Sequence, residues 1–395
     1  MSARPTLPPV LWLMAIGTFA IGTDAFVVAG VLPEIARDLD VSTAAAGQTI
    51  TLFSLTYAVF APVSATLTGS LSRRTVLRLA LVLFILGNVL SAVAASYGWL
   101  LAGRVVAALG AASFTPQASA AASALVEEKV RGRALGVVIG GLTVATALGV
   151  PLGTFLGDAF GWRATLVAVA VLGAVALAGG FALPRLEPAG RHTLGERLGA
   201  LRSLPVLATL LVTLLGVMSE HVLYAYIGPV LEPATGGDGA KLSLLLLVFG
   251  IGAVAGNAVA GRATDQYGPR PVLLLALGGM AVDLALTPLW AQSFPTAAVA
   301  LFVWGATGWM YLVPQQHRLL ELSAANGPFT VALNSSALYL GIGVAGAAGG
   351  AVVSGAGADW LPLPAALLGA AAVVLAVLTY RSRVSPVPVP ETQKA

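Results

Sequence analysis

Residues 243–262 of this chain read SLLLLVFGIGAVAGNAVAGR, a run whose single charge is its closing arginine. At 1.5 Å per residue, a helix of this length spans about 30 Å, the thickness of a bilayer's hydrocarbon core. No water is available there to hydrogen-bond the backbone, so the run must be helical. It also lacks the alternation typical of a membrane β-strand. The run therefore predicts a transmembrane α-helix.

Comparable runs recur along the 395 residues, of which 57% are hydrophobic and only 10% charged. Soluble domains carry about 25% charged residues, so most of this surface faces lipid. The chain is therefore predicted to be an all-α membrane protein of twelve transmembrane helices. The predicted spans are 10–32, 45–68, 77–96, 98–125, 134–157, 164–183, 206–228, 243–262, 271–290, 295–315, 328–353 and 363–381.

The two halves of the chain repeat each other. The segment from Gly69 to Arg78 recurs 192 residues later as Gly261 to Arg270. Proline positions match as well, with Pro116-Gln117 recurring as Pro314-Gln315 and Pro33 as Pro229. Such repeats are typical of transporters with alternating access. The organisation predicted is two pseudo-symmetric six-helix bundles, at 1–183 and 205–381, joined by a cytoplasmic linker at 184–204 and followed by a disordered tail at 382–395.

The distribution of Lys and Arg predicts the orientation. With the N-terminus inside, 17 of the 21 fall in cytoplasmic segments, three (Arg37, Arg163 and Lys241) fall in external loops, and Arg104 lies within a span. Both termini are therefore expected in the cytoplasm of a cell with this protein in its inner (plasma) membrane. The net charge of +4 is then a topological signal, and no nucleic-acid partner is expected.

Several motifs resemble the major facilitator superfamily. Gly261-Arg-Ala-Thr-Asp265-Gln-Tyr-Gly268-Pro-Arg270 is similar to its loop motif, and Arg104 with Gly110 is similar to its fourth-helix motif. Gly149-Val-Pro151-Leu-Gly153 resembles the fifth-helix motif of antiporters. The stretch from Gly22-Thr-Asp24 to Leu32-Pro33-Glu34 resembles the first helix of twelve-helix drug:proton antiporters, particularly bacterial chloramphenicol or arabinose efflux-type exporters.

The resemblance implies that the loop motif gates the cytoplasmic side. The gating and motif residues are then Gly69, Arg78, Gly149, Pro151, Gly153, Gly261, Asp265, Gly268 and Arg270. The first-half loop departs from the pattern, because Arg73 stands in the position of Asp265 and Val76 in that of Gly268. The complete loop motif, and with it the gating role that the resemblance implies, is therefore expected only in the second half.

Charged residues inside spans are functional candidates, because burying a charge in a bilayer costs about 2.5–3.5 kcal/mol. Asp24 is predicted to couple transport to protons, with a permanent structural ion pair as the alternative. Arg104 lies at a similar depth on a helix that the resemblance places against the same cavity, so it is expected to contact Asp24. Its alternative is to snorkel to the headgroups.

Glu220 stands nine residues before Pro229, as Asp24 stands before Pro33, so the repeat makes the two acids equivalent. We expect Glu220 to bind a proton or a cationic substrate. The adjacent His221 is expected to make a hydrogen bond at a helix interface. Asp283 falls in the ninth span, which the resemblance places away from the cavity, so its expected role is structural.

Aromatic and amide side chains on cavity-facing helices suit an apolar pocket with a few polar groups. The predicted substrate cavity contains Tyr57, Gln117, Tyr224, Tyr226, Trp309, Gln315 and Asn334. For Asn334, a hydrogen bond between helices is the alternative. The spacing of Gly149, Gly153 and Gly157 by four residues also predicts close helix packing.

The sequence contains none of the common catalytic motifs that would indicate an enzyme. The sequence has no cysteine, no H-E-x-x-H, G-x-S-x-G or Ser-x-x-Lys motif, and the Gly236–Lys241 stretch lacks P-loop spacing. No catalytic residue, metal site or cofactor is predicted. The predicted function is proton-coupled efflux of small amphipathic molecules such as antibiotics by a monomer in contact with lipid. A proton-coupled sugar or metabolite transporter and a non-transporting membrane receptor remain alternatives.

The orientation can be tested with accessibility labels. A label at Gly190 or at the C-terminus is expected to react only from the cytoplasm, and one at Gly237 only from outside, because of the Lys and Arg asymmetry. An external label at Gly190 would overturn both the orientation and the helix count.

Overall fold

The structure, a computed structural model, describes residues 8–68, 70–127, 131–181, 183–184, 203–322 and 327–381. These residues are helical nearly throughout and contain no strand. In the first half the helices are α1 (Val10–Val27), η1 (Val28–Gly30), α2 (Leu32–Asp38), α3 (Thr43–Leu67), α4 (Arg73–Ala92), α5 (Tyr97–Ala124), α6 (Arg131–Val144), the π-helix η3 (Ala145–Gly149), α7 (Val150–Phe160) and α8 (Trp162–Gly180).

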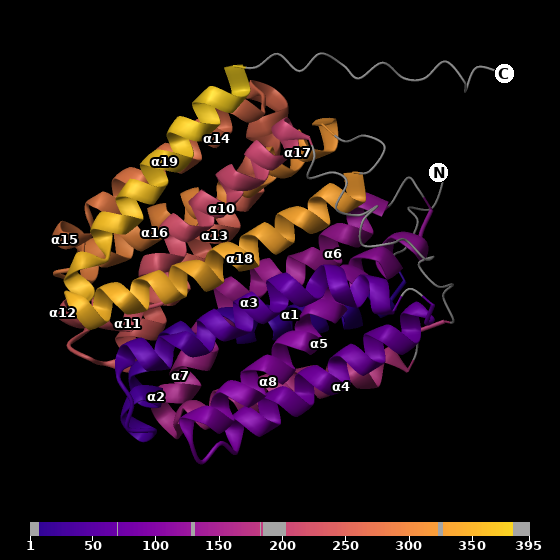
Figure 1. Cartoon of the computed structure of the whole chain (residues 1–395), viewed down its shortest axis with the longest axis horizontal. Helices are drawn as coiled ribbons and strands as arrows, with labels where there is room; N and C mark the ends of the chain where they lie inside the picture. The colour runs from indigo at the N-terminus through magenta and orange to yellow at the C-terminus, as the bar shows by residue number, and fades with distance from the viewer. Residues whose placement is uncertain are drawn as a thin grey trace, which may run out of the picture.

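The second half repeats this pattern. Its helices are α10 (Leu204–Tyr224), α11 (Ile227–Val230), α12 (Glu232–Thr235), α13 (Gly239–Tyr267), α14 (Pro269–Ala285), α15 (Thr287–Trp290), α16 (Phe294–Met310), α17 (Leu312–Leu322), α18 (Gly327–Gly355), η6 (Ala358–Trp360) and α19 (Pro362–Arg381). Figure 1 shows the first half, in indigo to magenta, below the second half, which runs from pink through orange to yellow.

Eleven helical segments of the described chain are long and apolar enough to cross a membrane. They coincide with eleven of the predicted spans. The remaining span, 271–290, is divided into α14, of 17 residues, and the short α15. Pro288 falls in the first turn of α15 and lacks a backbone N–H, so a continuous helix would lose a hydrogen bond there. The first predicted span, 10–32, is also interrupted before a proline. Its α-helix ends at Val27, and a 3-10 turn, η1, follows before α2, which has Pro33 in its first turn.

The predicted loop from Gly261 to Arg270 is wrong in its extent. Helix α13 continues through Tyr267, and α14 begins at Pro269. Gly268 alone makes the turn, at a φ of 82°, which favours glycine over any residue with a Cβ. The motif residues therefore lie on the ends of two helices rather than on a loop.

The two halves meet along two pairs of helices. One is α3 with α18, which run side by side across the middle of Figure 1. Glycines on α18 allow the close approach: a Cβ atom at Gly343 would come within 2.7 Å of Leu55, and one at Gly346 within 2.6 Å of Thr51. We call this contact the α3–α18 seam. Small residues of this kind let membrane helices pack backbone to backbone.

The second pair is η3 and α7 with α13. Gly250 of α13 packs on the backbone of Ala147. The Ser243 hydroxyl of α13 donates a 2.6 Å hydrogen bond to the Pro151 carbonyl. We call the end of the molecule that carries α2 and α11 the α2 end; at this end Gly228 of α11 also lies against Pro33. The two halves are thus in contact through several layers towards the α2 end.

The α3–α18 seam can be tested by adding bulk. Gly343→Val should force α18 away from α3, because the new side chain has no space beside Leu55. The chain has no cysteine, so Thr51→Cys supplies a unique buried reporter. Its labelling by a soluble thiol reagent should rise several-fold in the Gly343→Val background.

Gly278→Val is the matched control, because a Cβ there has no neighbour within 4 Å. Equal labelling in both glycine variants, with both proteins folded, would show that the seam does not restrict access to Thr51.

Candidate functional site

Asp24 and Arg104 form a buried ion pair between α1 and α5. The Arg104 Nη1 donates to Asp24 Oδ1 at 2.5 Å, and Nη2 donates to the Asp24 backbone carbonyl at 3.3 Å. The side chains are 0% and 1% exposed, so the arginine does not snorkel to the headgroups. The structure therefore brings together the two residues that the sequence assigned to proton coupling. Their function stays a prediction.

Two further residues complete the surroundings of this pair. Asn88 of α4 donates to Asp24 Oδ2 at 3.4 Å, and Phe53 of α3 lies under the Arg104 guanidinium at 4.4 Å. A cation over an aromatic face is stabilised by about 0.5–2 kcal/mol, with the larger values in desolvated sites. Four helices of the first half thus contribute to one charged site. Sequence reasoning missed Asn88 and Phe53, which carry no motif.

Glu220 on α10 is buried without an arginine. Its nearest basic group in the described chain is His221, whose Nδ1 lies 4.0 Å from the Glu220 carboxylate. The same His221 nitrogen is 3.1 Å from the Val217 carbonyl on its own helix, so the interface hydrogen bond expected for His221 is instead a contact within α10. The carboxylate lies against Gly308 of α16, where a Cβ would come within 3.1 Å of Oε1.

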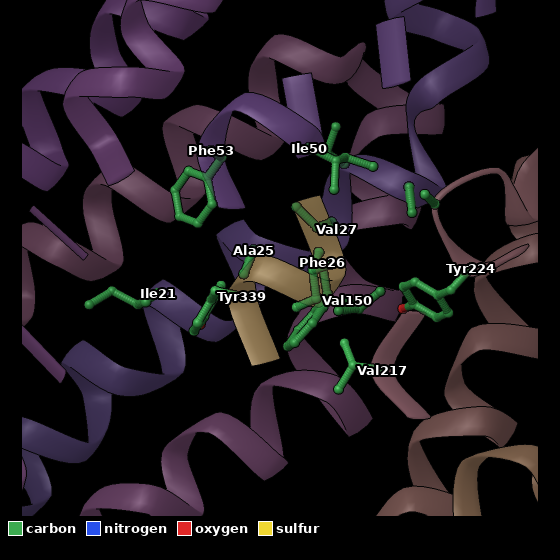
Figure 2. Close-up of a cluster of buried hydrophobic side chains, with 14 of the residues drawn as sticks. Ile21, Ala25, Phe26, Val27, Ile50, Phe53, Val150, Val217, Tyr224 and Tyr339 are labelled. Atoms are coloured by element: carbon green, nitrogen blue, oxygen red, sulfur yellow. The ribbon is translucent and has the colours of Figure 1, made fainter. Parts of the chain in front are cut away.

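Aromatic rings from both halves lie between these two acids. Phe26 of α1 packs against the rings of His221, Tyr224 and Trp309. In Figure 2, Phe26 lies between Tyr224 on one side and Tyr339 on the other. Tyr57 of α3 stacks on Tyr339 of α18, with centroids 3.6 Å apart. Neither Phe26 nor Tyr339 was among the aromatic residues predicted to line the cavity, because the sequence does not show which aromatic side chains of an apolar helix face the other half.

Most residues predicted to line a cavity are covered by protein in this conformation. Trp309 is half-buried, and the buried ones are Tyr57, Gln117, Tyr224, Tyr226, Gln315 and Asn334. Gln315 lies against α10, where its amide donates to the Thr209 carbonyl at 3.2 Å. The Tyr226 hydroxyl donates a 3.0 Å hydrogen bond to the carbonyl of Gly346 on α18, the helix that forms the α3–α18 seam. These two residues therefore bind neighbouring helices here rather than facing an open cavity.

The Gly149-Val-Pro151-Leu-Gly153 motif packs against the helix that carries Asp24. Gly149 lies beside Thr23, Gly153 beside Val27 and Gly157 beside Val31. The close packing predicted from their spacing is therefore present. A π-helical turn at 145–149 precedes Pro151, and such turns are frequent at functional sites. The Pro151 carbonyl accepts the hydrogen bond from Ser243, so the motif also touches the second half.

The gating residues are only partly described. Gly69 lies outside the described residues, and the side chain of Asp265 does too. Arg78 donates to the Gly180 carbonyl at the end of α8, and its guanidinium stacks on Phe181. Arg270 is exposed at the start of α14. Gly261 has no neighbour that a Cβ would meet.

Asp283 is buried on α14. Its Oδ2 atom has no hydrogen-bond partner in the described part of the chain, while its backbone carbonyl accepts from Trp290. The described residues hold no group of three or more His, Asp or Glu side chains that could bind a metal ion.

Comparison with known proteins identifies the fold and the family. The sequence profile of the Major Facilitator Superfamily matches residues 14–234 and 209–395. The chain belongs to this superfamily. It is 34% identical to the inner membrane transport protein YdhP of Escherichia coli (strain K12) over 377 residues, covering 94% of this chain and 96% of the relative.

Two other comparisons are informative. A chloramphenicol resistance protein of Streptomyces lividans is 37% identical over 281 residues, covering 69% of this chain and 70% of the relative. The partially occluded inward open conformation of the xylose transporter XylE from E. coli superposes with a TM-score of 0.74. It covers 95% of this chain and 99% of the transporter's, at 14% identity, so it supports the fold alone. The protein is thus a multi-pass membrane transporter of the major facilitator fold.

The buried ion pair can be tested by removing its cation. Arg104→Leu should lower the free energy of unfolding by on the order of 3–5 kcal/mol near neutral pH, because it leaves Asp24 as a buried unpaired carboxylate. The loss should shrink on acidification, since a proton can neutralise the carboxylate in place of the arginine. Denaturation of the purified protein at pH 8 and pH 5 measures both effects.

The double variant Asp24→Asn/Arg104→Leu should recover part of the stability at pH 8, because no buried charge remains. A deficit of equal size at both pH values would mean that lost packing, and not charge, accounts for the effect.

Proposed function

We propose that this transporter exports small amphipathic molecules, antibiotics among them, in exchange for protons. The observation that carries the proposal is the fully buried Asp24–Arg104 pair, which adjoins the aromatic contacts between the halves. A carboxylate in a membrane interior is rare and is typical of proton pathways. The similarity to a chloramphenicol resistance protein supports export, and so does the glycine and proline motif packed against α1.

In the proposed cycle, a proton arriving from outside neutralises Asp24, releases Arg104 from its anion and frees the site of substrate, which leaves to the outside. The carrier then closes on that side and opens towards the cytoplasm, where Asp24 loses its proton and a new substrate molecule binds. The loaded carrier turns outward again and completes the exchange. Asp265 and Arg270 hold the cytoplasmic helix ends together in the outward-open state. In the first half Arg73 stands in the position that matches Asp265, so this half lacks the acid of the motif. The protein works as a monomer, with both termini in the cytoplasm and its two bundles, 1–183 and 205–381, joined by 184–204.

Glu220 has a different part in this proposal. Among the described residues, the basic group nearest to its carboxylate is His221, at 4.0 Å, and an ionised carboxylate that lacks a cationic partner is costly in a buried site. The site around Glu220 is therefore complete only when a proton or a positively charged substrate group joins it. A proton-coupled sugar transporter is a weaker candidate, because the likeness to xylose transporters, at 14% and 17% identity, extends only to the fold.

The coupling role of Asp24 is tested by flux. In proteoliposomes with an imposed pH difference, wild-type protein should concentrate chloramphenicol or tetraphenylphosphonium, and a protonophore should abolish this. Asp24→Asn should remove the pH-driven accumulation, because an amide cannot alternate between charged and neutral forms. It should spare equilibrium binding, since the amide keeps the size of the carboxylate.

Glu220→Gln serves as the matched variant on the other acid. It should keep coupling and weaken the cation, tetraphenylphosphonium, more than the neutral chloramphenicol. Accumulation that survives Asp24→Asn but is lost in Glu220→Gln would transfer the coupling role to the second half.

A further inference from the structure

The Phe26 ring from the first half is held by three rings of the second half. Its centroid is 5.9 Å from His221, 6.5 Å from Tyr224 and 6.5 Å from Trp309. Two of these contacts are edge-on, at interplanar angles of 89° and 73°. Edge-to-face geometry at this distance is favourable for aromatic pairs. We call His221, Tyr224 and Trp309 the aromatic cage.

The cage is part of a larger aromatic wall that belongs to the second half alone. Tyr224 also contacts Phe249 at 5.3 Å and Trp304 at 6.1 Å. Phe249 and Trp304 contact each other at 5.4 Å. This support fixes Tyr224 independently of Phe26. His221 is held in turn by Tyr224, at 5.7 Å, and by the Val217 carbonyl, so these two cage rings have partners besides Phe26.

Phe26 is placed to leave when the two halves separate. It lies two residues after Asp24, where α1 gives way to the 3-10 turn at Val28–Gly30. It is 8% exposed, and its cage partners all belong to α10 and α16. Any movement of α1 away from these helices takes the ring out of the cage. The cage then exposes its aromatic faces together with the neighbouring Glu220.

We infer that Phe26 is an internal occupant of the substrate site, and that an aromatic ring of the substrate takes its place in the cage. The inference rests on the proposed transport function and names the part of the substrate that the second half recognises. A site that is occupied by its own side chain binds ligand with an apparent affinity equal to its intrinsic affinity multiplied by the fraction of time that the site is empty. The affinity of the cage for Phe26 therefore determines how tightly an aromatic ring of the substrate has to bind in order to displace it.

The experiment measures binding, not flux. Purified full-length protein in nanodiscs is titrated with radiolabelled tetraphenylphosphonium and, separately, with radiolabelled chloramphenicol. Phe26→Ala should bind at least one probe about tenfold more tightly than wild type, because the probe no longer displaces a ring that has three aromatic partners. Phe26→Leu, which keeps most of the volume without a ring, should show a smaller gain in the same direction.

Two further variants separate this role from packing. Phe26→Ala/Tyr224→Leu should lose the gain, because one wall of the cage is gone. Phe114→Ala removes a buried ring that packs on Gly17, away from the cage, and should lower stability without raising affinity. If Phe26→Leu and Phe26→Ala are folded and bind both probes no more tightly than wild type, the inference is overturned.

The outcome is independent of the flux assay. Tighter binding by Phe26→Ala with no pH-driven accumulation by wild type would support the site and refute the proposed antiport. Normal accumulation with no gain in affinity for either probe would refute only the role of Phe26.

Discussion

A buried charge in a membrane protein must be paired, and the pairing of Asp24 with Arg104 determines how the first half is organised. Neither side chain reaches water, so each depends on the other and on its neighbours for compensation. Asn88 and Phe53 supply that support from α4 and α3, and the glycines of η3 and α7 allow close packing behind α1. A change in the charge of Asp24 is therefore felt by every helix that contacts the pair.

The contacts between the halves are of another kind. In the α3–α18 seam, glycines pack on Leu55 and Thr51, and Tyr57 stacks on Tyr339. The contacts of Phe26 with the second half are tilted or edge-on ring contacts. Contacts of this sort depend on close packing more than on directional bonds. Phe53 and Tyr57 lie one turn apart on α3, the first under Arg104 and the second on Tyr339. Helix α3 thus connects the charged site of the first half with the α3–α18 seam between the halves.

The sequence predicted the helical spans well, because the cost of exposing a backbone to lipid is local and is visible in hydropathy. It also placed Asp24 and Arg104 at one depth, because rise per residue is constant along a helix. It did not predict the hydrogen bonds that Gln315 and Tyr226 make to neighbouring segments, since a helix that is apolar on all sides carries no mark of its rotation. Their assignment to the substrate cavity stays a prediction. The partners Phe26, Tyr339, Phe53 and Asn88 depend on how helices from distant parts of the chain meet.

The two acids show how far the internal repeat extends. Asp24 and Glu220 stand nine residues before Pro33 and Pro229, yet among the described residues Asp24 pairs with an arginine and Glu220 does not. By the offset between the two Pro-Gln pairs, Phe302 occupies the position of Arg104, and its side chain is exposed. Duplication therefore preserved the acid and not its partner. The first half pairs its carboxylate with an arginine, whereas in the second half the nearest described basic group to the Glu220 carboxylate is His221, at 4.0 Å. This difference in pairing is the reason why the proposed antiport assigns the coupling proton to the first half and substrate recognition to the second.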